Sequence, residues 1–267
     1  MTKGIRRFRL RLLAASRFAK RSRMMRTLAS SVTGGLCAGL LAIGCAHHQS
    51  VVSITPSAEH RATAVLSTND AQPVPAHEPR KANFEGEPKS RNAQRVADWV
   101  VDSGDNGGMP FVIVDKTDAR VFVFYGGGRI RGAARVLLGL AQGDDSIAGI
   151  GDRNLSEVRP EERTTPAGRF VASMGYNTHG KDVLWVDYKN AVSLHRVITT
   201  NPKERRLERL STPTPRDKRI SFGCINVPAK FFDDVVIPAF TGTSGIVYVL
   251  PEIRSNREVF ARYYDVE

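Results

Sequence analysis

Residues 111–125 read FVIVDKTDARVFVFY, and three glycines follow them at positions 126–128. Two short runs rich in Val and Phe, separated by polar residues and followed by a glycine turn signal, are typical of neighbouring β-strands. Similar runs recur along the chain at residues 135–138, 169–173, 183–186, 192–197 and 246–250. Many short strands with turn signals between them predict an antiparallel sandwich or barrel rather than alternating strands and helices.

Two segments have helical spacing instead. Ser90 can cap a helix in which Val96, Trp99 and Val100 recur at helical intervals. Residues 228–240 begin with a proline suited to the first helical position and contain pairs of apolar residues for a buried face. The long irregular stretch at residues 139–165 exceeds an ordinary connection, which predicts a functional loop.

The net charge of +12 is concentrated at the start of the chain. Ten of the 39 basic residues precede Glu59, the first acidic residue, which leaves 29 basic residues against all 27 acidic ones. The rest of the chain therefore has no electrostatic footprint for a phosphate backbone, and we expect no nucleic-acid partner. A basic start followed by an apolar, small-residue run indicates an export signal in residues 1–45 and a location in the periplasm or cell envelope.

The end of this signal allows two kinds of processing. Residues 41–45, Leu-Ala-Ile-Gly-Cys, resemble a bacterial lipobox, in which Cys45 would be lipidated and would anchor the protein to a membrane. Simple cleavage after Ala46 is the alternative. Residues 46–90 are polar and contain five prolines, which predicts a flexible linker, and residues 91–267 then form the folded domain.

Cys224 is the one thiol in that predicted domain, because Cys37 and Cys45 lie in the signal segment. A lone thiol in an oxidising compartment is either buried and inert or kept for its chemistry. A thiolate nucleophile needs a base, since a free thiol with a pKa of about 8.5 is mostly protonated at neutral pH. Two histidines lie in the domain, His195 in an apolar strand and His179 in a loop. A histidine on an apolar strand is more often structural than catalytic.

The residues around the thiol read Ser221-Phe222-Gly223-Cys224-Ile225-Asn226. Gly223 leaves space for an approaching carbonyl, and the amides of Gly223 and Cys224 could bind a developing oxyanion. Asn226 could orient the loop or a substrate.

This order of residues resembles the L,D-transpeptidases of bacterial cell walls. Their signature is a His, an intervening stretch, and then Ser/Thr-His-Gly-Cys, an apolar residue and Asn or Arg. His195 followed by residues 221–226 is similar to it, and residues 165–170, Thr-Pro-Ala-Gly-Arg-Phe, are similar to the family's Thr-Pro-x-Gly-x-Phe turn. The resemblance covers residues 111–251. It implies a mixed, mainly antiparallel β-sandwich with a few short helices, a monomer without cofactor or metal, and peptidoglycan peptide stems as donor and acceptor.

The resemblance also implies roles for single residues. Cys224 is then the nucleophile and His195 the base, with its ring oriented by the carbonyl of Arg196, while the residues facing the oxyanion or substrate are Gly223, Ser221, Asn226 and Arg196. Two positions depart from the pattern. Phe222 stands where the family has a second His, and Arg196 where a Gly often follows the first His.

The gap between the two motifs is longer than the family usually shows. Residues 199–219, called the insertion here, contain seven basic and three acidic residues, and Asn201-Pro202 predicts the start of a short helix that runs to Leu210. The insertion is interpreted either as a solvated face or as a lid that attracts carboxylates. Three other functions stay open: an L,D-carboxypeptidase, a catalytically silent peptidoglycan-binding lipoprotein, and a zinc site made of Cys224, His195 and His179.

Overall fold

The Val- and Phe-rich residues at 111–125 form two antiparallel strands, β1 (Phe111–Asp115) and β2 (Arg120–Phe124). They belong to the computed structural model, which describes residues 78–267 of the chain. The predicted signal segment, Cys45 and most of the predicted linker lie outside the described residues. Among residues 78–267, no helix combines the length and the apolar character that crossing a membrane would require.

A large mixed sheet of eight strands organises the described residues, in the order β3-β2-β1-β10-β5-β6-β7-β9. The other members are β3 (Ile130–Arg135), β5 (Gly168–Tyr176), β6 (Asp182–Asp187), β7 (Val192–Arg196), β9 (Ile225–Val227) and β10 (Ser244–Val249). The pairs β1/β10 and β7/β9 are parallel, and the other neighbours are antiparallel. A second, two-stranded sheet joins β4 (Leu138–Gly139) to β8 (Arg219–Ser221). The prediction of a mainly β fold with few short helices is confirmed.

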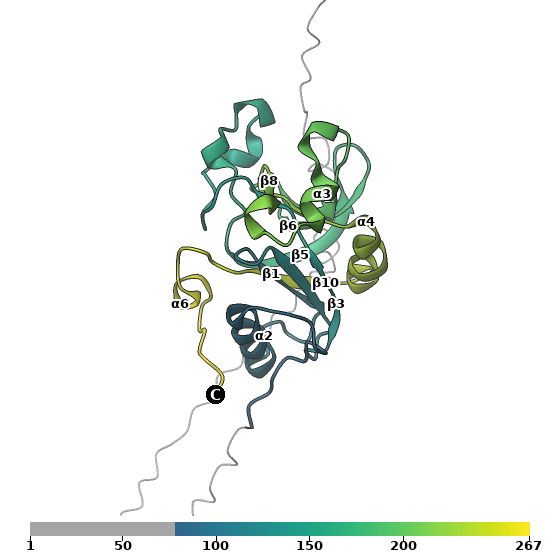
Figure 1. The fold of residues 1–267 in the computed structure, drawn as a ribbon. Coiled ribbons are helices and arrows are strands. Elements are labelled where there is room, and N and C mark those ends of the chain that lie inside the picture. The colour runs from purple at the N-terminus through teal and green to yellow at the C-terminus, as the bar shows by residue number, and fades with distance from the viewer. Residues whose placement is uncertain (1–77) are drawn as a thin grey trace, which may run out of the picture. The chain divides into compact units, whose positions relative to one another are not determined.

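Both faces of the large sheet are covered at β1, which explains why β1 is apolar from Phe111 to Val114 rather than alternating. Phe111 and Ile113 pack on the side of the helix α2, whereas Val112 and Val114 belong to a separate core on the opposite side. Figure 1 shows α2 on one side of the sheet and the segment with α3 and β8 on the other. The segments that carry His195 and Cys224 lie beside the second core, because β7 and β9 contribute Leu194 and Ile225 to it.

The first predicted helix is confirmed as α2 (Arg91–Ser103). The hydroxyl of Ser90 accepts a hydrogen bond from the amide of Ala93 at 3.0 Å, as an N-cap does, and Gly104 ends the helix in the left-handed conformation. Part of the predicted linker is folded as well. Ala82 and Phe84 are buried, and the amide of Ala82 donates to Asp98 of α2 at 2.8 Å. The folded part of the chain therefore begins before residue 90, where the predicted linker ends.

The second predicted helix, at residues 228–240, is a helical segment of three parts. It runs through α4 (Ala229–Phe231), a π-helical turn η6 (Phe232–Val236) and α5 (Ile237–Phe240). Phe232 and Val236 are buried, as the apolar pattern indicated. The chain ends with the short helix α6 (Asn256–Val259).

Two strand and turn predictions need correction. Residues 135–138 do not form one strand, because the chain leaves the large sheet after Arg135 and joins β8 at Leu138. Residues 165–170 do not form the turn that the resemblance implies, because residues 165–167 carry no turn and β5 begins at Gly168. The long loop contains three short 3₁₀ helices: η1 (Ile150–Asp152), η2 (Leu155–Glu157) and η3 (Pro160–Glu162).

The insertion contains two 3₁₀ helices and one α-helix. They are η4 (Pro202–Glu204), α3 (Arg206–Ser211) and η5 (Pro215–Lys218). The side chain of Asn201 caps η4 by accepting from the amide of Lys203. The helix predicted from Asn201 to Leu210 is thus present, interrupted at Arg205, which adopts the left-handed conformation with φ 49°.

Candidate active site

The Cys224 loop joins β8 to β9 and turns sharply at Gly223. This glycine has φ 129°, and a Cβ at its position would lie 2.7 Å from the carbonyl oxygen of Thr164. Only a glycine fits both the backbone conformation and the space. The thiol of Cys224 is half-buried, with its Sγ 3.6 Å from the carbonyl of Ala191 and 3.7 Å from the hydroxyl of Ser193.

Ser221 shapes this loop from within. Its buried hydroxyl donates to the carbonyl of Cys224 at 2.6 Å and accepts from the amide of Gly223 at 3.1 Å. The amide of Gly223 is therefore engaged inside the loop, whereas no hydrogen bond holds the amide of Cys224 among residues 78–267. Of the two amides that the sequence suggested for an oxyanion, the structure leaves that of Cys224 available.

Parallel pairing of β7 with β9 brings the two motifs together, and it places His195 directly opposite Asn226. Nδ1 of His195 lies 2.7 Å from the carbonyl oxygen of Arg196. Because a carbonyl only accepts, Nδ1 donates the hydrogen, and Nε2 of the neutral ring keeps a lone pair. The ring can therefore accept a proton at Nε2.

The thiol and the imidazole perturb each other. Burial raises the pKa of the Cys224 thiol, but the hydrogen bond and charge of His195 and the contacts of Ser193 lower it more, so that this pKa lies below its ordinary value. Burial lowers the pKa of His195, whereas the hydrogen bond and charge of Cys224 and the Arg196 carbonyl raise it above its ordinary value. A partly exposed thiol with an adjacent, oriented imidazole is a nucleophile and base pair suited to acyl transfer.

Asn226 is buried and connects the pair to the insertion. Its Nδ2 lies 3.3 Å from Nε2 of His195 and 3.3 Å from the carbonyl oxygen of Cys224, and its Oδ1 accepts from Arg206 at 2.6 Å. The predicted role of Asn226 in orienting the loop agrees with these contacts. The side chain of Arg196 lies elsewhere, because its guanidinium pairs with Asp182 and Asp233. The carbonyl of Arg196, and not its side chain, belongs to the site.

Sequence reasoning missed the role of Thr165. Its fully buried hydroxyl donates to the carbonyl of Gly223 at 2.9 Å and accepts from the amide of Gly139 at 2.8 Å. The hydroxyl therefore connects β4 to the Cys224 loop. Ser193 was missed as well, although its place two residues before His195 puts it on the same side of β7. That two-residue spacing is the signal that could have identified it.

Phe222, in place of the family's second His, is half-buried, and the guanidinium of Arg163 lies 4.0 Å from the centre of its ring. A cation over an aromatic face is a stabilising contact, so Arg163 and Phe222 hold the long loop at residues 139–165 against the Cys224 loop. His179 is exposed in the connection between β5 and β6, where its ring contacts Thr178. No group of three His, Cys, Asp or Glu side chains suited to a metal occurs in the described part of the chain.

The arginines of the insertion are mostly engaged within the protein. Arg205 pairs with Glu208, Arg206 pairs with Glu204 and Asn226, and Arg209 donates to two backbone carbonyls. They are not free cations on a lid, which argues against the carboxylate-attracting interpretation for these three residues.

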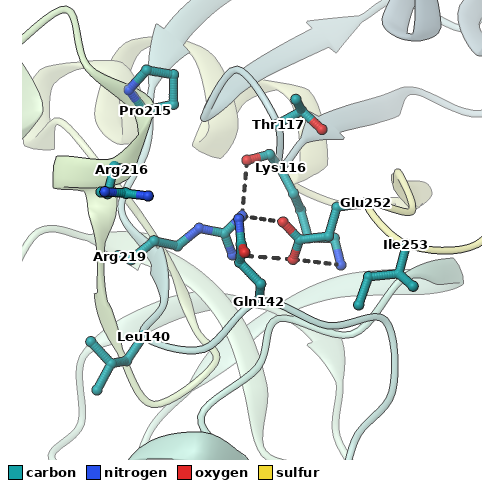
Figure 2. Close-up of a pocket in the computed structure, with 9 residues that line it drawn as sticks. All are labelled: Lys116, Thr117, Leu140, Gln142, Pro215, Arg216, Arg219, Glu252 and Ile253. Atoms are coloured by element: carbon teal, nitrogen blue, oxygen red, sulfur yellow. Dashed lines mark hydrogen bonds and ion pairs between the residues drawn. The ribbon is translucent and has the colours of Figure 1, made fainter.

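A cavity of about 580 Å³ lies beside β8, with a buried charge network as its floor. Nζ of Lys116 contacts Asp144 at 2.7 Å. It also lies 3.4 Å from Glu252, to which Arg219 donates (Figure 2). The guanidinium of Arg216 borders the same cavity and has no hydrogen bond or ion pair with any residue of the described range. The buried charges are paired within the protein, so the floor itself does not require a ligand.

No protein-family model and no curated protein matches the chain. Among solved structures, it is similar to a mutant of the helical cell shape determining protein Pgp2 of Campylobacter jejuni, with 16% identity and a TM-score of 0.37 over 63% of this chain and 58% of that one. It is also similar to the catalytic domain of the Enterococcus faecium L,D-transpeptidase, with 16% identity and a TM-score of 0.31 over 54% and 98% of the two chains.

A third similar structure is the L,D-transpeptidase of Xylanimonas cellulosilytica, with 14% identity and a TM-score of 0.32 over 54% of this chain and 61% of that one. The chain spans about half the length of two others, 49% of an avibactam carbamoyl enzyme and 50% of a mutant L,D-transpeptidase of Enterococcus faecium.

Proposed function

We propose that the protein is a peptidoglycan L,D-transpeptidase that forms cross-links through a thioester on Cys224. The observation that carries this proposal is the pairing of a half-buried thiol with His195, whose tautomer is fixed by the Arg196 carbonyl. This pair lies on a β-rich framework with the residue order that resembles the L,D-transpeptidase signature.

The proposed reaction has two acyl-transfer steps. His195 takes the proton of the Cys224 thiol at Nε2, and the thiolate attacks the carbonyl that precedes the terminal D-residue of a peptide stem. The amide of Cys224 binds the oxyanion. The peptide C–N bond then breaks, His195 protonates the leaving amine, and a thioester remains on Cys224.

The second step releases the enzyme. A side-chain amine of another stem attacks the thioester carbonyl, the S–C bond breaks, and a new amide forms between the two stems. His195 accepts the proton of the attacking amine and returns one to the sulfur. If water attacks instead, the product is a trimmed stem and the enzyme is an L,D-carboxypeptidase.

The test separates these activities from a silent peptidoglycan-binding protein. Purified protein is incubated with a carbapenem and its intact mass is measured, and it is then incubated with tetrapeptide stems. We expect the mass of the wild type to increase by one carbapenem and that of Cys224→Ala to stay unchanged. We also expect the wild type to join tetrapeptide stems into cross-linked stem dimers. Trimmed monomer alone would indicate the carboxypeptidase. Peptidoglycan binding without acylation and without stem processing would contradict the proposal.

The variants His195→Ala and His179→Ala form a matched pair, because both remove an imidazole but only His195 contacts the thiol. His195→Ala should abolish release of the terminal D-residue, and His179→Ala should keep most of it. The double variant Cys224→Ala/His195→Ala should be no worse than either single one, since a nucleophile and its base act as one unit.

We further propose that the protein acts in the cell envelope after export. The ten basic residues and the apolar run before Cys45 support this. The N-terminus of protein from envelope fractions should be a lipid-modified Cys45, or the product of cleavage after Ala46. An intact, unprocessed N-terminus would overturn the proposal.

A further inference from the structure

Arg206, at the start of α3, connects the insertion to the catalytic pair. Its side chain is 11% exposed, with Nε 2.5 Å from the carboxylate of Glu204 and Nη1 2.6 Å from Oδ1 of Asn226. A guanidinium has donors and no acceptor, so the atom of Asn226 that faces it must be the amide oxygen. Arg206, together with the Cys224 carbonyl that Nδ2 contacts, therefore favours this orientation of the Asn226 amide.

With the oxygen facing Arg206, the NH₂ group of Asn226 faces the catalytic residues. Nδ2 lies 3.3 Å from both Nε2 of His195 and the carbonyl oxygen of Cys224. These contacts use both N–H bonds of the amide. The bond to His195 requires a lone pair on Nε2, which the ring has only when it is neutral and carries its hydrogen on Nδ1.

The opposite amide orientation would favour a different state of the ring. It would place Oδ1 beside Nε2, where it would accept a hydrogen bond from a protonated Nε2, and it would set the NH₂ group against the guanidinium. Two facing donors in a buried position are unfavourable, so Arg206 opposes this orientation.

We propose that Arg206 is a positioning residue that, by helping to fix the Asn226 amide, favours the neutral His195 ring with its hydrogen on Nδ1, whose Nε2 exchanges its bond to Asn226 for the Cys224 proton. The inference rests on the proposed function in taking His195 as the base. It gives the insertion a specific task in the site, which neither the solvated-face nor the lid interpretation included.

The pKa of His195 lies above its ordinary value, and Arg206 limits that rise. Among the described residues, Cys224, from the loop before β9, and Arg206, from α3, act on the ring in opposite directions. The Cys224 interactions raise the pKa of His195, whereas the charge of Arg206 lowers it. The carboxylate of Asp182 on neighbouring β6 is bound to the guanidinium of Arg196.

The first test uses Arg206→Met, which keeps much of the apolar stem and removes the donors. Arg205→Met is the matched control, because it removes the same charge from the adjacent residue, and Arg205 pairs only with Glu208. The rate of Cys224 alkylation by iodoacetamide is measured against pH, which requires no peptide substrate.

Arg206→Met removes one of the contacts that hold the amide, so the turned amide and the imidazolium become more favourable and more of the thiol is ionised at low pH. We expect alkylation at pH 6 to rise about two- to thirteenfold, the factor that one hydrogen bond of roughly 0.5–1.5 kcal/mol provides. Arg205→Met should match the wild type, and Arg206→Lys should lie closer to the wild type than Arg206→Met. Equal profiles for Arg206→Met and Arg205→Met would overturn the proposal.

The second test does not depend on a variant that folds. In ¹⁵N–¹H correlation spectra of the wild-type imidazoles at neutral pH, His195 should show hydrogen on Nδ1 and a bare Nε2. Hydrogen on Nε2 in the neutral ring would also overturn the proposal. If the tautomer is as expected and the alkylation profile of Arg206→Met departs from that of Arg205→Met, but stems are not processed, the proposed function fails while the role of Arg206 stands.

Discussion

Replacing Thr165 with Val tests whether one buried hydroxyl holds the Cys224 loop in place. Valine has nearly the same shape, but it cannot accept from the amide of Gly139 or donate to the carbonyl of Gly223. Both bonds are buried, so the change leaves one donor and one acceptor unpaired away from water. The shape of the core is otherwise unchanged.

The magnitude follows from these two groups. An unpaired buried polar group costs about 1–3 kcal/mol, so the two groups left by Thr165→Val should lower the free energy of unfolding by roughly 2–6 kcal/mol. Thr165→Ser is the control, because it keeps the hydroxyl and removes one methyl group, for a loss of about 1 kcal/mol. The variants thus separate the loss of hydrogen bonds from the loss of volume.

Urea denaturation followed by tryptophan fluorescence measures the difference, with unchanged m-values as the check that the transition stays two-state. Carbapenem acylation should slow more in Thr165→Val than in Thr165→Ser, since the carbonyl of Gly223 is released next to Cys224. If the two variants unfold within 0.5 kcal/mol of each other (about the error of such a comparison), the hydroxyl does not hold the loop and the reasoning is refuted.

Three further predictions concern ionisable side chains. In His195→Ala, burial acts on Cys224 without the opposing imidazole, so the thiol pKa should rise and iodoacetamide alkylation at pH 7 should slow at least about tenfold; an unchanged rate would contradict the pairing. Hydrogen bonds from Arg153 and Arg159 hold the pKa of Glu162 down at about 2, below its usual 4.5. Its stabilising effect is therefore present above pH 4.5 and lost as the pH falls through about 2, and urea midpoints between pH 5 and pH 2 should fall less in Glu162→Gln than in the wild type. Lys116→Met breaks a fully buried ion pair with Asp144 and should destabilise the fold by about 3–5 kcal/mol in the same unfolding assay, whereas a loss below 1 kcal/mol would show that the network is dispensable.

The sequence predicted most of the longer strands, but not β3 (Ile130–Arg135), whose residues are mostly small or basic. The Val- and Phe-rich runs of β1 and β2 and the helix capped by Ser90 are where the pattern placed them. The strands β8 and β9 were not predicted, because each has three residues and too few positions for an apolar period. The parallel pairing of β1 with β10 also has no local signal, because it joins distant parts of the chain.

The predicted strand at residues 135–138 shows how tertiary contacts override local preference. Val136 and Leu137 are apolar and fully buried, yet the amide of Val136 bonds to Ala119 while that of Leu137 bonds to Asn226. The backbone hydrogen-bond partner changes from one residue to the next, and the strand propensities of single residues contain no information about such a change.

Residues of the candidate site could be predicted where the proposed chemistry requires a particular residue type. They could not be predicted where a residue matters only because of its position in the folded chain. A lone Cys224, the preceding glycine and a strand histidine were visible in the sequence. The hydroxyl of Thr165 and the guanidinium of Arg206 were not, because their importance depends on which buried groups lack partners after folding. One signal did exist, since Asn226 in an apolar strand must find a donor for its carbonyl oxygen.

The parallel alignment of β7 and β9 has a consequence for how this domain tolerates change. Parallel neighbours need a long crossover, and lengthening a crossover adds little entropy of loop closure, so its length is nearly independent of the alignment. The insertion can therefore change in length without shifting this alignment, so that His195 stays opposite Asn226. A replacement for the part of the insertion before β8 would have to bring one guanidinium to the position of Arg206, while β8 and the Cys224 loop stay as they are.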